Sequence, residues 1–83
     1  MQNKYEETMR ISDLCLVVTL SLKKFPIAYI DKTNPKRAEF YFPNSEELTN
    51  FINVYWSGNS VVEPKAFFNQ LKTIKSMLYF ESS

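Results

Sequence analysis

Few residues of this chain could take part in catalysis. It has no histidine and a single cysteine, Cys15, and its adjacent carboxylates are the pairs Glu6–Glu7 and Glu46–Glu47. Histidine is the usual proton shuttle near neutral pH and a common zinc ligand, and one thiol can form neither an internal disulfide nor a metal cage. Neighbouring side chains point about 100° apart on a helix, so paired glutamates do not converge on a substrate. We therefore expect no enzymatic activity, no metal and no cofactor.

Cys15 stands in the hydrophobic run that begins at Leu14, where burial would raise the pKa of its thiol and make it inert. The single glycine, Gly58, follows a predicted helix instead of opening one, so the chain has no glycine-rich phosphate loop. These observations leave binding as the better hypothesis.

Charge is distributed unevenly along the chain, although the formal net charge is only +1. Residues 23–37 contain five basic residues and one acid, whereas residues 38–63 contain four acids and no base. The basic segment, with a tyrosine available to stack on a base, is the candidate nucleic-acid contact: Lys23, Lys24, Lys32, Lys36, Arg37 and Tyr41, or Tyr29 in its place. The alternative is that these lysines only solubilise turns and protect a strand edge from aggregation.

Aromatic residues make up 16% of the chain, more than a core of this size readily hides. Adjacent rings such as Tyr55–Trp56 and Phe67–Phe68 cannot both face inward. We therefore predict an exposed protein-binding surface that includes Tyr55, Trp56, Phe68 and Tyr79. The alternative is that the outer ring of each pair covers the core rim with its polar tip in water.

The elements that position these residues follow from local patterns. Ser12 and Asp13 indicate a helix start, and Pro26 disfavours helical geometry at Phe25, so we predict a largely buried helix between them. Its β-branched residues make a strand the competing interpretation, but the run is long for one. Two runs of period two follow, residues 27–32 and 37–43, separated by turn residues, and they predict a hairpin.

Two further helices follow the hairpin. Asn44 and Glu47 form a capping-box pattern, with Ser45 as a neighbouring cap, and Gly58 marks the end of that helix. Glu63 followed by Pro64 opens the last helix. The two apolar stripes are Leu48, Phe51, Ile52, Tyr55 and Trp56 in the first of these helices, and Phe67, Leu71, Ile74 and Leu78 in the second.

The chain is 83 residues long and 45% hydrophobic, which indicates one small domain. We predict an α+β fold of order α-β-β-α-α, with two layers in which an antiparallel β-hairpin packs against three helices over residues 11–81. Residues 1–10 lack an apolar rhythm and are expected to be a flexible lead-in. No run approaches the about 18 apolar residues of a membrane span, and the polar, acidic start is unlike a signal peptide, so we expect a cytoplasmic protein.

Residues 11–80 resemble a family of small uncharacterised domains from prokaryotic and phage-like genomes. The resemblance rests on helix caps, stops and core aromatics, namely Ser12–Leu14, Phe25–Pro26, Lys36–Phe42, Ser45–Leu48, Tyr55–Gly58, Glu63–Lys65 and Leu71–Ser76. It implies a mobile-element or defence context and no assigned activity.

Our leading hypothesis is a non-enzymatic accessory or adaptor module of a larger protein–nucleic acid machine. Its basic hairpin would touch nucleic acid weakly while its aromatic surface docks on protein. The alternative is a pure protein-binding module, such as a phage or mobile-element inhibitor or a small dimeric regulator, in which Glu46 and Glu47 meet a basic groove. Free strand edges also permit a homodimer by sheet pairing.

Overall fold

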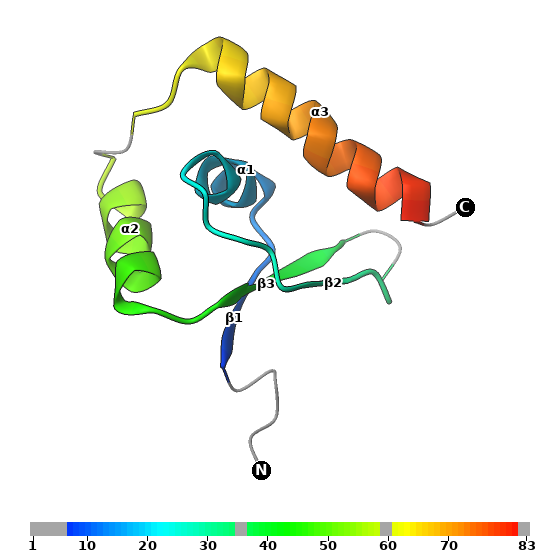
Figure 1. Ribbon diagram of the computed structural model, residues 1–83, viewed down its shortest axis with the longest axis horizontal. Helices are drawn as coiled ribbons and strands as arrows, with labels where there is room; N and C mark the ends of the chain where they lie inside the picture. The colour runs from blue at the N-terminus through cyan, green and yellow to red at the C-terminus, as the bar shows by residue number, and fades with distance from the viewer. Residues whose placement is uncertain (1–6, 35–36, 59–60, 82–83) are drawn as a thin grey trace.

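A computed structural model shows an α+β fold with three helices and a three-stranded antiparallel sheet (Figure 1). It describes residues 7–34, 37–58 and 61–81, with only the backbone described for residues 79–81. In chain order, the elements are β1 (Thr8–Ile11), α1 (Leu14–Leu22), β2 (Tyr29–Asp31), β3 (Glu39–Pro43), α2 (Glu46–Trp56) and α3 (Pro64–Glu81). The predicted fold class is confirmed.

The sheet has the order β1-β3-β2, so β3 is its central strand. The predicted hairpin of β2 and β3 is present, but β1 adds a third strand that pairs with β3 from Thr8 opposite Pro43 to Ile11 opposite Phe40. The expectation of a loose lead-in is wrong for residues 8–10, because they belong to β1. Four residues are too few for a rhythm to stand out in sequence, and pairing with β3 is what holds them extended.

One face of the sheet forms the floor of the core. Phe40 and Phe42 of β3 are fully buried, together with Ile11 of β1, whereas Tyr41 between them points to the other face. This alternation follows the period of two that the sequence shows over residues 37–43. In Figure 1, α1 and α3 lie on one side of the sheet, and the opposite face carries no helix among the described residues.

Helix α1 lies between the sheet and α3 (Figure 1), and five consecutive residues, Leu16–Leu20, are buried. A helix that is apolar on all sides can only be stable when it is enclosed on all sides. The prediction of a mostly buried helix is therefore confirmed. Cys15, however, is exposed in the first turn, before the buried stretch begins, so its predicted burial is wrong.

The helix starts are set by side-chain caps. The Asp13 carboxylate accepts a hydrogen bond from the Leu16 amide, and the Ser45 hydroxyl accepts one from the Leu48 amide. Glu63 accepts one from the Ala66 amide and precedes Pro64 as predicted. The first two caps lie one residue after Ser12 and Asn44, the first residue of each predicted start signal.

Helix ends use left-handed residues. Gly58 has φ 84° and terminates α2 as predicted. Helix α1 ends before Pro26, because Lys24 takes φ 71° and the Phe25 amide donates to the Leu20 carbonyl, a Schellman arrangement. In the described part of the chain, no helix has the length and apolar character needed to cross a membrane.

Candidate functional site

The basic residues predicted to contact nucleic acid do not form one surface. Lys23 caps the C-terminal end of α1, with Lys24 beside it, and both are exposed. The Arg37 guanidinium donates a hydrogen bond of 2.8 Å to the Ser12 hydroxyl, which lies at the opposite end of the same helix. A helix of nine residues is about 14 Å long, so the two ends of α1 lie about that far apart.

Lys32 lies at a third location, near the C-terminal end of α3. Its ammonium donates a 3.4 Å hydrogen bond to the carbonyl of Leu78, near the C-terminal end of α3 where a positive charge is favoured. Lys36 lies outside the described residues. The described basic residues of this segment are therefore divided among both ends of α1 and the end of α3.

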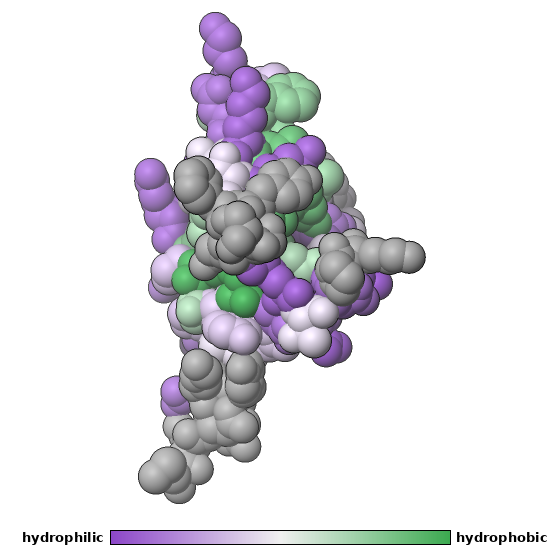
Figure 2. Space-filling model, turned by 90° about the vertical axis from the view of Figure 1, so that its right-hand side faces the viewer, coloured by the Kyte–Doolittle hydropathy of each residue, from purple (hydrophilic) through white to green (hydrophobic). Residues whose placement is uncertain are grey.

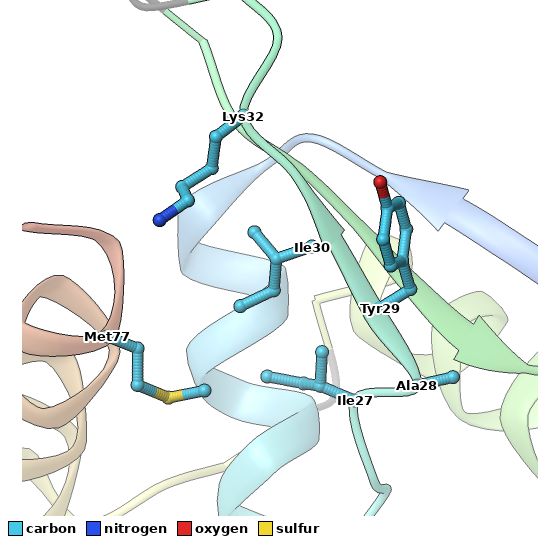
Figure 3. A pocket seen from close by; sticks show the side chains of 6 residues that line it. All are labelled: Ile27, Ala28, Tyr29, Ile30, Lys32 and Met77. Atoms are coloured by element: carbon cyan, nitrogen blue, oxygen red, sulfur yellow. The ribbon is translucent and has the colours of Figure 1, made fainter. Parts of the chain in front are cut away.

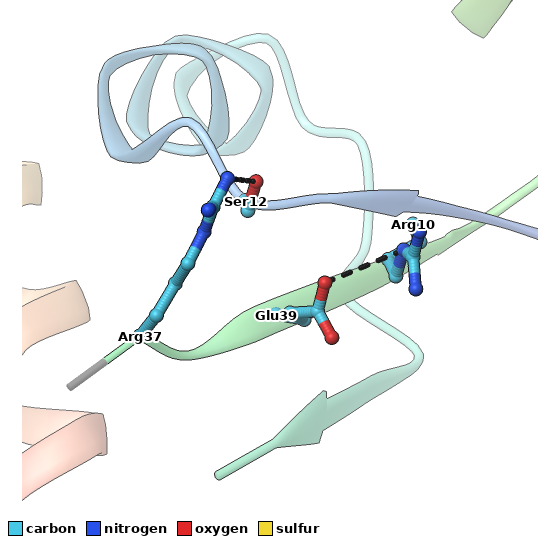
Figure 4. A network of polar contacts seen from close by, with 4 residues as sticks. All are labelled: Arg10, Ser12, Arg37 and Glu39. Atoms are coloured by element: carbon cyan, nitrogen blue, oxygen red, sulfur yellow. Dashed lines mark hydrogen bonds and ion pairs between the residues drawn. The ribbon is translucent and has the colours of Figure 1, made fainter. Parts of the chain in front are cut away.

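Two arginines instead contact polar side chains along β1 and just after it, each with its own partner (Figure 4). Arg37 reaches from the start of β3 to Ser12, and Arg10 of β1 forms an ion pair of 3.3 Å with Glu39 of β3. The Arg10 side chain is 63% exposed and that of Glu39 31%, so this pair is weakly held in water. Both guanidiniums are therefore near the surface on the face of the sheet opposite the helices.

A row of side chains crosses this open face. Arg10, Tyr41 and Tyr29 stand directly opposite one another in the strand register, one from each strand. The two tyrosine rings have centroids 5.7 Å apart and a tilt of 51°. Tyr41 is thus packed against Tyr29, and it lies on the open face away from Lys23 and Lys24.

A groove of about 280 Å³ follows the outer edge of β1, and we call it the β1 groove. One wall is formed by the consecutive residues 9–13 with Leu16, and the other by Ile52 and Trp56 of α2. Side chains on a strand alternate between the two faces of the sheet. A hollow lined by consecutive residues of a strand must therefore face its edge.

Trp56 is the aromatic residue that lines this groove, and 62% of its surface is exposed. Tyr55, its neighbour, is half-buried and meets it edge to face with ring centroids 5.0 Å apart. Burial raises the pKa of the Tyr55 phenol, and repulsion from the Asp13 carboxylate and from Cys15 in its deprotonated form raises it further. α2 thus presents one ring inward and one outward.

The other predicted aromatic residues are separate. Phe68 of α3 is also 62% exposed, and its ring meets that of Phe67 at 5.9 Å. The Tyr79 side chain lies outside the described part of the structure. Exposure of Trp56 and Phe68 agrees with the predicted aromatic surface, whereas Tyr55 faces the core.

A second groove, of about 310 Å³, follows the outer edge of β2, and we call it the β2 groove. In Figure 3, Ile27 and Ile30 converge on Met77 of α3, while Tyr29 points away from them. The Lys32 side chain extends over the same space toward α3. Figure 2 shows this side of the molecule, where small hydrophobic areas are separated by hydrophilic side chains.

Sequence analysis missed the β1 groove because it did not predict β1. Met9, Arg10 and Ile11 had been assigned to a lead-in or left without a role. The signal that could have found them is the short alternation of Thr8–Ile11, in which Met9 and Ile11 are apolar while Thr8 and Arg10 are polar.

Comparison with known protein families gives a match that covers most of the chain. The family model described as Domain of unknown function (DUF5659) matches residues 6–80, nearly the whole chain. This confirms the resemblance to a family of uncharacterised domains. No curated protein matches the chain, and no solved structure matches it.

Proposed function

This chain belongs to the Domain of unknown function (DUF5659) family, and we propose that it works as a non-enzymatic protein-binding module that docks on a larger protein through the β1 groove. The observation that carries the proposal is Trp56, which is 62% exposed and forms one wall of an apolar groove. Tryptophan is among the residue types that most often dominate binding energy, particularly where it can be fully desolvated by a partner.

A protein partner fits this groove better than a nucleic acid. Ile52 and Trp56 offer apolar surface, with the buried Leu16 at the base of the groove, whereas nucleic-acid binding requires a continuous basic stripe. The described basic residues of the 23–37 segment are divided among three places, so Lys23 and Lys24 would supply only an auxiliary contact if the partner carries nucleic acid. An accessory subunit or inhibitor of phage or mobile-element origin is consistent with this proposal.

The test compares two equally exposed rings. The tagged full chain is cross-linked in its native host and purified with and without nuclease, and the recovered partner is then produced and titrated. Trp56→Ala is expected to weaken binding about thirtyfold, the effect of losing a dominant interface residue. Phe68→Ala is the matched control, because Phe68 has the same exposed fraction but lies on α3.

Two results would contradict the proposal. Loss of the partner on Phe68→Ala with retention on Trp56→Ala would place the interface on α3. Loss of every partner after nuclease treatment would show that a nucleic acid holds the complex together.

A further inference from the structure

We infer that the β1 groove takes an extended peptide segment of the partner, which adds beside β1 as a further strand and alternates apolar with acidic residues. This inference rests on the proposed function and specifies the chemistry of its partner. It depends on three observations: the direction of the β1 backbone groups, the apolar wall of the groove and the arginines on the open face.

The backbone of Arg10 points away from β3. The Asn44 amide donates to the Glu7 carbonyl at 2.8 Å, which makes Glu7 and Asn44 a hydrogen-bonded pair. Such pairs alternate along an antiparallel ladder, so Met9 and Ile11 bond to β3 and Arg10 does not. Tyr41 stands opposite Arg10, and its carbonyl accepts a hydrogen bond from the Ala28 amide. The Tyr41 carbonyl therefore points toward β2 and away from Arg10. The N–H and C=O of Arg10 therefore face the β1 groove.

An added strand would place alternate side chains on the two faces of the sheet. Residues opposite Met9 and Ile11 would point to the helix side, where Ile52 and Trp56 form an apolar wall. These positions favour apolar side chains, because the wall loses water only when it is covered by a similar surface. The 62% exposed Trp56 would be the main contact of the peptide.

The residues between them would point to the open face. The residue opposite Arg10 would stand beside its guanidinium, and the next one on that face would stand beside Ser12, to which Arg37 donates. The cations here are Arg10 and Arg37, set against Glu39 and against Asp13, which lines the groove and accepts a hydrogen bond from the Leu16 amide. Because the Arg10–Glu39 pair is largely exposed, Arg10 can also pair with an acid across the new strand boundary. These positions therefore favour glutamate or aspartate.

The experiment uses three synthetic peptides added to the full chain and followed by amide NMR spectra. The first alternates valine with glutamate, the second valine with lysine, and the third serine with glutamate. We expect the first to shift the amides of residues 9–12 and the indole of Trp56, with an affinity about tenfold higher than that of either control. The Arg10→Glu variant should reverse the preference to the lysine peptide.

Proline isolates the backbone contribution. Arg10→Pro and Arg10→Ala both remove the guanidinium, but only proline also removes the outward N–H, and proline is tolerated where an edge-strand N–H faces outward. Arg10→Pro should bind the first peptide about tenfold more weakly than Arg10→Ala, as expected for one lost hydrogen bond. A melting curve confirms folding, and if Arg10→Pro does not fold, the charge reversal in Arg10→Glu decides.

Several outcomes would overturn the inference. Equal binding of all three peptides, or equal loss in the proline and alanine variants, would exclude an alternating added strand. Tighter binding of a single-stranded oligothymidine at the same amides would indicate nucleic acid. A dimer in sedimentation that Arg10→Pro abolishes would make a second copy of this chain the occupant. If no peptide shifts β1 while Trp56→Ala still disrupts the natural complex, the partner docks a folded surface, and only the proposed function stands.

Discussion

At the β2 edge of the sheet, the Lys32 ammonium donates to the Leu78 carbonyl and Met77 of α3 packs over Ile27 and Ile30. At the β1 edge, the facing wall is Trp56 of α2, which is 62% exposed. Both edges border a groove of similar volume, about 310 and 280 Å³. The difference is that a long helix is tied to one edge, while the other faces a ring with little of its surface covered.

Edge strands expose backbone groups that can pair with another chain, and proteins commonly protect them by shortness, charge or a covering element. β2 is three residues long, and Met77 and the Lys32 hydrogen bond connect α3 to the groove at its edge. β1 is four residues long, and its outward residue is Arg10, a charge that discourages uncontrolled pairing but accepts an acidic partner. The contrast indicates that β1 is the edge available for selective binding.

The largest expected effect comes from the strand that both edges share. Phe40 of β3 is 1% exposed and stands opposite Ile11 of β1 and Ile30 of β2. Phe40→Ala should cost about 3–5 kcal/mol and bring the domain close to unfolding, measured by urea denaturation. Tyr41→Ala, on the open face, is the control and should cost clearly less. Equal losses would mean that the open face is also part of the core.

A second prediction tests the two directions of the β1 backbone. Met9→Pro removes an amide that bonds to β3, leaves the Phe42 carbonyl without its donor, and should cost about 2 kcal/mol in thermal or urea unfolding. Arg10→Pro removes an amide that points outward and should cost less than half as much. The opposite order of stability would show that Arg10, not Met9, holds β1 to the sheet.

A smaller effect is expected at the β2 edge. Lys32→Gln shortens the side chain that reaches Leu78 and should lower stability by about 0.5–1 kcal/mol. Amide hydrogen exchange should become faster in the last turns of α3 and stay unchanged in β1. Lys72→Gln, on an exposed face of the same helix, is the control. If both variants behave alike, Lys32 does not tie α3 to the edge.

The smallest effect is a pH dependence at the end of β2. The Thr33 hydroxyl and then its amide, which donates at 2.9 Å, stabilise the Asp31 carboxylate and lower its pKa below the ordinary value. Because the pKa of Asp31 is lowered in the folded state, its hydrogen bonds stabilise the fold fully above the ordinary pKa. This stabilisation is lost as the pH falls through the pKa of the folded state. NMR titration should place the Asp31 midpoint below the ordinary value of an aspartate, and the Thr33 amide should follow it. A midpoint at or above that value would contradict the turn geometry.

Helices and their ends were predictable from sequence because their signals are local. Glu63 before Pro64, Gly58 after α2 and the stripe that includes Ile74 each act within about one turn of their own helix. The nucleic-acid surface was not predictable in the same way. Lys23 and Arg37 belong to the same basic segment of the sequence, yet in the structure they lie at opposite ends of α1.

The amino-acid sequence by itself determined the fold class, the three helices and the alternation that buries Phe40 and Phe42, since each depends on neighbouring residues and their period. Only the tertiary structure decided that Thr8–Ile11 is a strand, because so short a segment is extended only when a distant strand satisfies its hydrogen bonds. That pairing also created the free edge, and α2 then placed Trp56 across from it. The candidate site is therefore a product of non-local contacts, which is why no local pattern revealed it.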